Sequence, residues 1–344
     1  MSTVSPHPSD IRDPEQLSAV IKQQYGYYEQ IKKELSHVIV GMDSVIEELV
    51  IGILCKGHCI LQGMPGLAKT MLISKLAGLM ELNFSRIQFT PDLMPTDITG
   101  GEVLEEDKTT GKRVFRFIQG PIFSNFLLAD EVNRTPPKSQ SALLEAMEER
   151  QLSVAGKTYQ LPDPFFVLAT QNPIEVEGTY PLPEAQLDRF IMKIHVKYPS
   201  REAEHEICRR QTTNYRYQVK PIINSEILHT MQALVRQVIV ADHVYSYAID
   251  LVRMSRPGEG LIPAELKDVI QYGGGPRASI ALIMAAKARA LLHQRHHATT
   301  GDIEAVAFPV LRHRIIPTFN AEAKGFDPDH IIAALLKNAR KQSN

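Results

Sequence analysis

The chain has 344 residues, a hydrophobic fraction of 44% and a net charge of −1, from 38 basic and 39 acidic residues. A chain of this length is expected to form two or three domains. The balanced charge excludes a surface that coats nucleic acid or an anionic membrane by charge alone. Three cysteines (Cys55, Cys59 and Cys208) make no disulfide framework, and no apolar run reaches the roughly 18 residues of a transmembrane helix. We therefore expect a cytoplasmic protein that is not inserted in a membrane.

Hydrophobic periodicity predicts one helix over residues 15–35 and another over residues 45–53. Residues 1–14 are rich in Ser, Pro and His, have little apolar surface to bury, and are expected to be disordered. Val40 and Gly41 lie in the turn between the two helices. A glycine turn here fits backbone laid against an adenine ring, and it fits a plain helix–helix turn equally well.

A glycine-containing loop, residues 63–70, follows an apolar run and precedes another helical pattern. Strand, loop and helix in this order are the setting of a phosphate-binding loop, whose backbone N–H groups and helix N-terminus bind phosphate. Lys69 is expected to reach the β- and γ-phosphates, and the Thr70 hydroxyl to bind Mg²⁺. The pattern has Gly before the Lys, whereas this chain has Ala68. We expect Gly66, after Pro65, to supply the turn instead.

An apolar run at residues 124–131 ends in two carboxylates, Asp130 and Glu131. A buried parallel strand places such residues at its carboxyl end, where α/β sheets bind ligands. Asp130 is expected to hold Mg²⁺ through its shell, and Glu131 to polarise the attacking water. A strand ending in a solvated acidic turn is the alternative, but the position of the pair after Lys69 favours catalysis. Asn172 ends the next buried strand, where it is placed to reach the same water or is simply a turn residue before proline.

Residues 102–118 and 151–161 are each predicted to form a hairpin inserted into the helical layer. Residues 190–196 alternate between two faces and predict a half-exposed strand at an edge of the sheet. Arg189, at the entry to this strand, is expected on the surface. It is either a solvated charge or a finger donated to the nucleotide of a neighbouring subunit.

From residue 200 onward nearly the whole chain has a helical pattern, which predicts a separate helical domain. Its longest helix is expected to begin at Pro276, after three glycines, with Arg277 in the first turn. A cation in a first turn opposes the helix dipole. This placement suggests a partner anion such as a γ-phosphate.

These segments, taken together, resemble the MoxR family of AAA+ ATPases. The matching blocks are residues 40–41, 63–70, 89–100, 127–134, 142–149, 169–173, 177–190 and 275–278. The sequence Gly-Leu-Ala-Lys-Thr at 66–70 is similar to the family's own usage, so Ala68 is no defect in the loop.

The resemblance implies an α/β fold, an AAA+ αβα core with a five-stranded parallel sheet in the order 5-1-4-3-2, plus a C-terminal all-helical lid domain. The implied parts are a nucleotide-binding domain at 15–199, a helical linker at 200–240 and the lid domain at 241–344. The implied nucleotide-binding residues are Val40, Gly41, Gly63, Pro65, Gly66, Leu67, Ala68, Lys69, Thr70, Met71 and Asp130. Thr70 and Asp130 are the implied Mg²⁺ ligands, partly through water.

The implied catalytic residues are Glu131, Asn172 as sensor 1, Arg189 as a trans-acting finger and Arg277 as sensor 2, brought in when the lid closes. Arg134 is a second candidate for contact in trans. The family resemblance further implies a ring, usually a hexamer, that hydrolyses ATP with Mg²⁺ and acts on protein clients in a chaperone-like way. Partners with von Willebrand factor A domains are often associated with such proteins.

A nucleic-acid motor is the rival hypothesis, because related ATPases with the same two hairpins include helicases. The hairpins here carry the basic residues Lys108, Lys112, Arg113, Arg116 and Lys157, but Glu102, Glu105, Glu106 and Asp107 lie beside them. With a neutral chain overall, a nucleic-acid partner is not expected. A metal-chelatase-type motor is a variant of the first hypothesis. A passive nucleotide-dependent scaffold is disfavoured by the Asp130–Glu131 pair, because a protein that only binds nucleotide needs no residue that activates water.

Overall fold

The computed structural model describes residues 14–106, 113–154, 156–172 and 179–343. The segment expected to be disordered, residues 1–14, lies outside this range except for Pro14, where the first helix begins. The helices are α1 (Pro14–Ser36), α2 (Asp43–Leu54), α3 (Lys69–Leu79), α4 (Pro95–Thr99), α5 (Pro137–Glu149), α6 (Glu184–Leu187), α7 (Arg201–Gln211), α8 (Ser225–Gln237), α9 (Asp242–Arg253), α10 (Pro276–Leu292), α11 (Thr300–Leu311), α12 (Phe319–Ala323) and α13 (Pro328–Ser343).

The centre of the molecule is a five-stranded parallel sheet in the order β2-β5-β8-β1-β9. Its strands are β1 (His58–Gly63), β2 (Phe84–Gln88), β5 (Phe126–Asp130), β8 (Phe166–Gln171) and β9 (Phe190–Val196). Counting only these strands along the chain, the order is 5-1-4-3-2. The predicted AAA+ topology is therefore confirmed.

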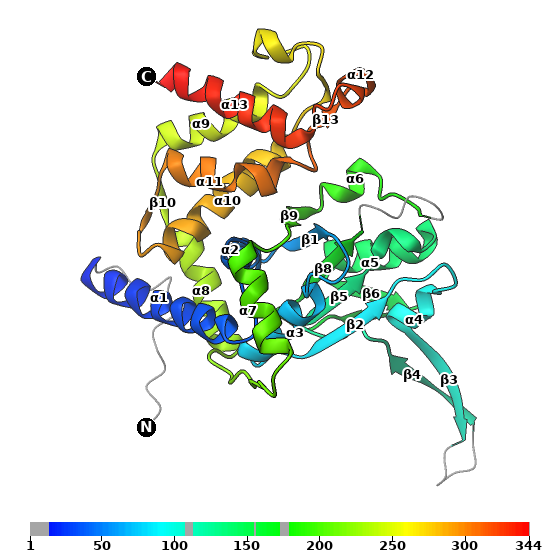
Figure 1. Ribbon diagram of the computed structural model, residues 1–344. Coiled ribbons are helices and arrows are strands. Elements are labelled where there is room, and N and C mark those ends of the chain that lie inside the picture. Colours follow the sequence, from blue (N-terminus) through cyan, green and yellow to red (C-terminus); the bar gives the residue numbers. More distant parts are fainter. Residues whose placement is uncertain (1–13, 107–112, 155, 173–178, 344) are drawn as a thin grey trace.

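Successive side chains of a strand point to opposite faces of the sheet, and both faces are buried under helices. In β5, Phe126 and Leu128 belong to a core shared with α1, α2, α3 and the C-terminal helices. Leu127 and Ala129 belong to a second core under α4 and α5. The sheet is thus the middle of three layers (Figure 1).

The strand β9 was predicted to be half-exposed and to lie at an edge of the sheet, and the structure confirms both points. Met192, Ile194 and Val196 face the core as expected, and the opposite face is half-buried. The Arg312 guanidinium, just after α11, donates to the Lys193 carbonyl oxygen at 2.7 Å. Burial lowers the pKa of Lys193.

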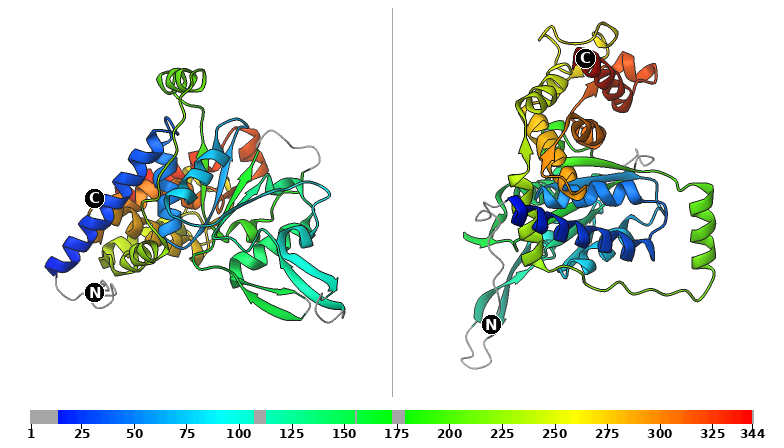
Figure 2. Two further views of the ribbon diagram at one scale, coloured as in Figure 1. Left: turned by 90° about the horizontal axis from the view of Figure 1, so that it is seen from below. Right: turned by 90° about the vertical axis from the view of Figure 1, so that its left-hand side faces the viewer.

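Both predicted hairpins are present. β3 (Gly100–Glu106) pairs with β4 (Arg113–Gln119), and β6 (Gln151–Val154) pairs with β7 (Lys157–Gln160), each antiparallel. The turn expected at 107–111 lies outside the described residues. The β3–β4 hairpin projects far from the core in the two views of Figure 2.

The C-terminal part is mainly helical, as predicted, but it is not all-helical. It also contains two small strand pairs, β10 (Ile239–Val240) with β12 (His297–Ala298) and β11 (Ile270–Tyr272) with β13 (Ile316–Pro317). α8 shares the core cluster of α2 and α10, and its Gln232 donates to the Ile53 carbonyl oxygen at 2.9 Å. α7 differs, since none of its residues is buried and it stands off the core (Figure 2). No helix in the described ranges is long and apolar enough to span a bilayer.

Candidate functional site

A cavity of about 410 Å³ lies at the carboxyl ends of the central strands. It brings together most of the residues that the sequence predicted for nucleotide binding and hydrolysis. They are Pro65, Gly66, Leu67, Ala68, Lys69, Thr70, Met71, Asp130, Glu131 and Asn172. Thr170 and Gln171 complete the wall.

The loop that leaves β1 turns through two residues in the left-handed backbone region, Gly66 (φ +81°) and Ala68 (φ +54°). Glycine adopts this backbone region without strain, which suits Gly66. The same conformation at Ala68 explains why the general pattern has glycine before the lysine. Lys69 then begins α3, and its ammonium group donates back to the Gly63 and Met64 carbonyl oxygens. Burial lowers the pKa of Lys69, while Asp130 and Glu131 oppose that shift.

Asp130 is buried at the end of β5 and is held from two sides. The Thr170 hydroxyl donates to its Oδ1 at 2.6 Å, and the Arg86 guanidinium donates to its Oδ2 at 2.6 and 3.0 Å. Sequence reasoning missed both partners. The pairing of β2 with β5 brings Arg86 within reach, and β2 carries no recognisable pattern of its own.

Glu131 has a left-handed backbone (φ +57°), and its N–H donates to the Thr170 hydroxyl oxygen at 2.9 Å. The Gln88 amide donates to its Oε2 at 2.7 Å, and Arg134 pairs with the same oxygen at 3.1 Å. The carboxylate is therefore fixed in place at the cavity wall. Arg134, a candidate for contact in trans, lies beside Glu131 of its own chain.

The oxygen donors at this cavity fit Mg²⁺, a hard cation that prefers carboxylate, hydroxyl and water oxygens. Thr70 and Asp130 line the same cavity, beside the loop that would hold the phosphates. Thr170 and Arg86 hold the Asp130 carboxylate in position at the end of β5.

A second cavity, of about 470 Å³, adjoins the first and shares Pro65, Gly66, Leu67, Ala68 and Met71 with it. Val40 and Gly41 line its other side, where the sequence left a base-binding turn and a plain turn equally open. Gly41 has φ +74°, and a Cβ there would lie 2.9 Å from the Ala203 Cβ. This glycine allows α7 to approach.

α7 supplies a wall of this second cavity that sequence reasoning did not foresee, through Glu204, Ile207 and Cys208. Arg210 ties the helix to the end of α1, because its guanidinium donates to the Ser36 and His37 carbonyl oxygens at 2.8 and 2.9 Å. The cavity is mainly apolar, as a purine base requires.

Arg189 lies at the opposite end of the sheet, before the first residue of β9. His58 pairs with Phe190 and Gly63 with Val196, so Arg189 is next to the start of β1 and the phosphate loop is at its end. Six strand residues separate the two ends by about 16 Å. Arg189 is thus too far from the phosphate loop of its own chain to touch a nucleotide there.

The resemblance implies that Arg277 is sensor 2, which reaches a γ-phosphate when the lid closes. The structure places it beside Arg189. Glu148 of α5 binds Arg189 through Oε2 at 2.6 Å and Arg277 through Oε1 at 3.3 Å. A cavity of about 340 Å³ at this place is lined by both arginines, by Arg236 and Arg314, and by no residue of the phosphate loop.

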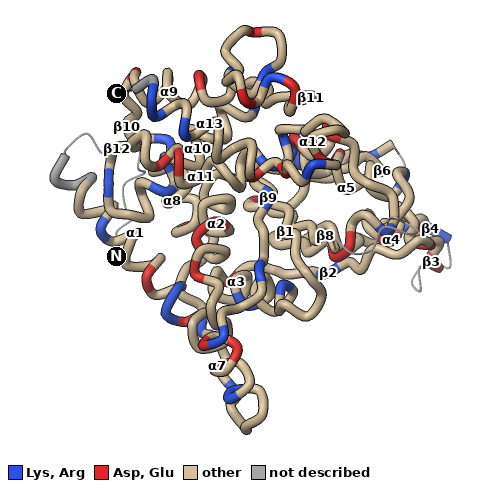
Figure 3. Tube along the Cα trace, turned by 45° about the horizontal axis from the view of Figure 1, so that its top comes forward, with Lys and Arg blue, Asp and Glu red and all other residues tan. Residues whose placement is uncertain are grey.

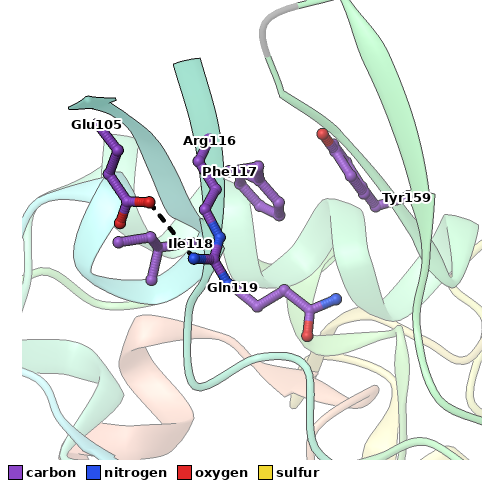
Figure 4. A pocket seen from close by; sticks show the side chains of 6 residues that line it. All are labelled: Glu105, Arg116, Phe117, Ile118, Gln119 and Tyr159. Carbon is purple, nitrogen blue, oxygen red and sulfur yellow. Dashed lines mark hydrogen bonds and ion pairs between the residues drawn. The ribbon is translucent and has the colours of Figure 1, made fainter. Parts of the chain in front are cut away.

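A third region, between the two hairpins, is hollow and partly aromatic. A cavity of about 560 Å³ there is lined by Glu105, Arg116, Phe117, Ile118, Gln119 and Tyr159. Phe117 and Tyr159 stack with ring centroids 4.3 Å apart, joining the hairpins, while Arg116 pairs with Glu105 (Figure 4). Farther out on the β3–β4 hairpin, Phe115 is 70% exposed.

The chain matches two protein-family models. One, described as the ATPase family associated with various cellular activities (AAA), matches residues 58–192, and an AAA lid domain matches residues 265–335.

Individual proteins are also similar. The chain is 44% identical to Chaperone MoxR1 of Mycobacterium tuberculosis, over 88% of this chain and 79% of that protein. It is 41% identical to YeaC of Bacillus subtilis, over 88% and 91% of the two chains. A crystal structure of a protein from Cytophaga hutchinsonii superposes with a TM-score of 0.85 at 42% identity, over 94% of this chain and 97% of that one.

Proposed function

The chain belongs to the MoxR family of AAA ATPases, and we propose that it hydrolyses ATP with Mg²⁺ in order to remodel partner proteins. One observation carries the proposal. Lys69, Thr70, Asp130 and Glu131, from two separate strand ends, line one cavity that adjoins a second, mainly apolar one. A protein that only bound nucleotide would have no need of Glu131.

The residues divide the chemistry between them. Backbone N–H groups of the loop and the Lys69 ammonium group neutralise the phosphates, and the Glu131 carboxylate accepts a hydrogen bond from the attacking water. Asn172 lies on the same wall and orients that water or the γ-phosphate. Mg²⁺, held by Thr70 and Asp130, supplies charge neutralisation on the phosphates when bound.

Arg189 and Arg277 are assigned to the nucleotide of a neighbouring subunit. They lie together at the end of the sheet away from their own phosphate loop. A closed ring, which we take to be a hexamer, brings the arginine end of each subunit to the phosphate end of the next. Hydrolysis then depends on assembly.

The hairpins are the proposed surface for protein clients, because they project from the core and expose apolar side chains such as Phe115. The relative MoxR1 is named a chaperone. Partners with von Willebrand factor A domains and a cytoplasmic location belong to the same proposal.

A nucleic-acid motor has less support. On the described part of the hairpins, Glu102, Glu105 and Glu106 accompany Arg113, Arg116 and Lys157. Figure 3 shows acidic and basic residues interspersed along the trace. DNA that stimulates ATP turnover, with a steep loss at higher salt, would overturn this choice.

Two measurements test the proposed function. Glu131→Gln should bind ATP normally and turn it over at least about 100-fold more slowly, whereas Glu149→Gln, an exposed neighbour of the arginine site, should behave like wild type. Turnover at the wild-type rate would refute the assignment of Glu131. For the trans arrangement, inactive Glu131→Gln and Arg189→Ala subunits should regain activity when they are mixed, because one supplies the arginine and the other the intact phosphate site.

A further inference from the structure

We infer that Glu148 is a positioning residue, which holds Arg189 and Arg277 at one fixed spacing for the γ-phosphate of the neighbouring subunit. The inference rests on the proposed function, since it concerns how the arginine end of the sheet is prepared before assembly. Nothing in the sequence singled Glu148 out, and it touches neither the phosphate loop nor its cavity.

The contacts of Arg189 make Glu148 its anchor. The Arg189 guanidinium meets Glu148 Oε2 at 2.6 Å, and its Nε is buried with no hydrogen-bond partner among the described residues. The side chain is 31% exposed, so solvent does not fully replace a missing anchor. Without Glu148 the guanidinium would be free to leave this orientation.

Arg277 uses the other oxygen of the same carboxylate, at 3.3 Å, and approaches Asp188 at 3.9 Å. Two guanidinium cations repel each other unless an anion lies between them. A carboxylate and a phosphoryl group both offer neighbouring oxygens to arginine, and both form paired hydrogen bonds with it. Glu148 therefore holds one guanidinium group on each of its two oxygens, and a phosphoryl group has neighbouring oxygens that can bind the same pair of arginines.

The supports of Glu148 are rigid. It belongs to α5, whose Leu143, Leu144, Ala146 and Met147 are buried in the core under the sheet. The adjacent Met147 carbonyl oxygen accepts a hydrogen bond from buried His58 Nε2 at 3.2 Å. Because reacting groups must be held to within about 1 Å of their place, a rigid support for the arginines affects rate rather than ATP affinity.

The test compares Glu148→Ala, Glu148→Gln and the matched control Glu149→Ala in the full-length chain, with ATP turnover measured at protein concentrations that assemble the ring. We expect Glu148→Ala to lower kcat at least about tenfold with KM for ATP within about twofold of wild type, and Glu148→Gln, which keeps the shape but not the charge, to lower it by about threefold. Glu149→Ala should leave both constants unchanged. If Glu148→Ala does not fold, the Glu148→Gln result decides.

Mixing experiments separate positioning from a general structural role. Glu148→Ala subunits mixed with Glu131→Gln subunits should regain activity, because the second subunit supplies correctly held arginines. Mixed with Arg189→Ala subunits they should not. A Glu148→Ala enzyme with unchanged or increased kcat, or one rescued by Arg189→Ala, overturns the inference. Failure of Arg189→Ala and Glu131→Gln to rescue each other would instead overturn the trans arrangement itself.

Discussion

The two ends of the central sheet carry the same kinds of side chain in exchanged roles. At the carboxyl end the carboxylates Asp130 and Glu131 face the nucleotide cavity, and Arg86 and Arg134 hold them. At the amino end a carboxylate holds Arg189 and Arg277, which the proposed function offers to the nucleotide of a neighbouring subunit. The charge of a side chain alone therefore does not indicate whether it acts on the nucleotide or holds another residue in place. Its position relative to the phosphate loop is needed as well.

The comparison predicts that variants at the two ends fail in different ways. Lys69→Ala should weaken ATP binding about 100-fold, because the phosphates lose their principal cation. Arg189→Ala should leave ATP binding within about twofold and lower kcat by about 10³-fold or more, the range of a trans-acting arginine. Equilibrium binding of a fluorescent nucleotide and steady-state turnover measure the two effects. Arg189→Ala with an ATP affinity as low as that of Lys69→Ala would abolish the distinction between the ends.

The two ends of the sheet also differ in how well the sequence predicts their residues. Lys69 and Asp130 follow strands with clear apolar runs, so their meeting at one edge of the sheet was predictable. The fold class and the strand order were predictable through the family resemblance. The place of Arg277 beside Arg189 was not predictable, because it depends on how α10 packs on the core, which no local pattern encodes. Glu148 is one of several acidic residues on α5 and becomes distinct only through residues far away in sequence.

Arg314 offers a second way to disturb the amino end alone. It is 8% exposed, and it joins α11 to the start of β9 by donating to Asp188 Oδ1 at 2.7 Å and to the Phe190 carbonyl oxygen at 2.7 Å. Arg314→Ala should lower the free energy of unfolding by about 2 kcal/mol, because the Phe190 carbonyl oxygen and the part-exposed Asp188 carboxylate lose this hydrogen-bond donor. Urea unfolding measures this loss, and Arg340→Ala, an exposed arginine, is the control. An unchanged unfolding midpoint would show that the lid is not fastened there.

Lowering the pH should reduce the folding stability of the protein through His58, which lies at the amino end of the sheet. Val167 N–H donates to its Nδ1 at 2.9 Å, so the ring is neutral with the proton on Nε2, and burial lowers its pKa to about 4. The unfolded chain protonates this residue near pH 6.5, so it binds more protons than the folded chain between those values, and stability falls as pH is lowered from 6.5 to 4. The contribution is about 3 kcal/mol over this window.

His58→Gln should therefore show a smaller fall in urea midpoint between pH 7 and pH 5 than wild type, and His296→Gln, an exposed histidine, should not. An equal fall in all three proteins would assign the acid sensitivity to other groups.

The smallest expected effect concerns the carboxyl end and its base cavity. α7 has no buried residue, so its place over that cavity depends on polar links to α1, chiefly those of Arg210. Arg210→Ala should raise KM for ATP about tenfold and leave kcat unchanged, because the phosphates and both arginines keep their positions. The neighbouring Arg209, which pairs with Glu206 on the same helix, provides the matched control, Arg209→Ala. A fall in kcat for Arg210→Ala would mean that α7 also governs the arrangement at the phosphate end, and the two halves of the nucleotide site would then act as one unit.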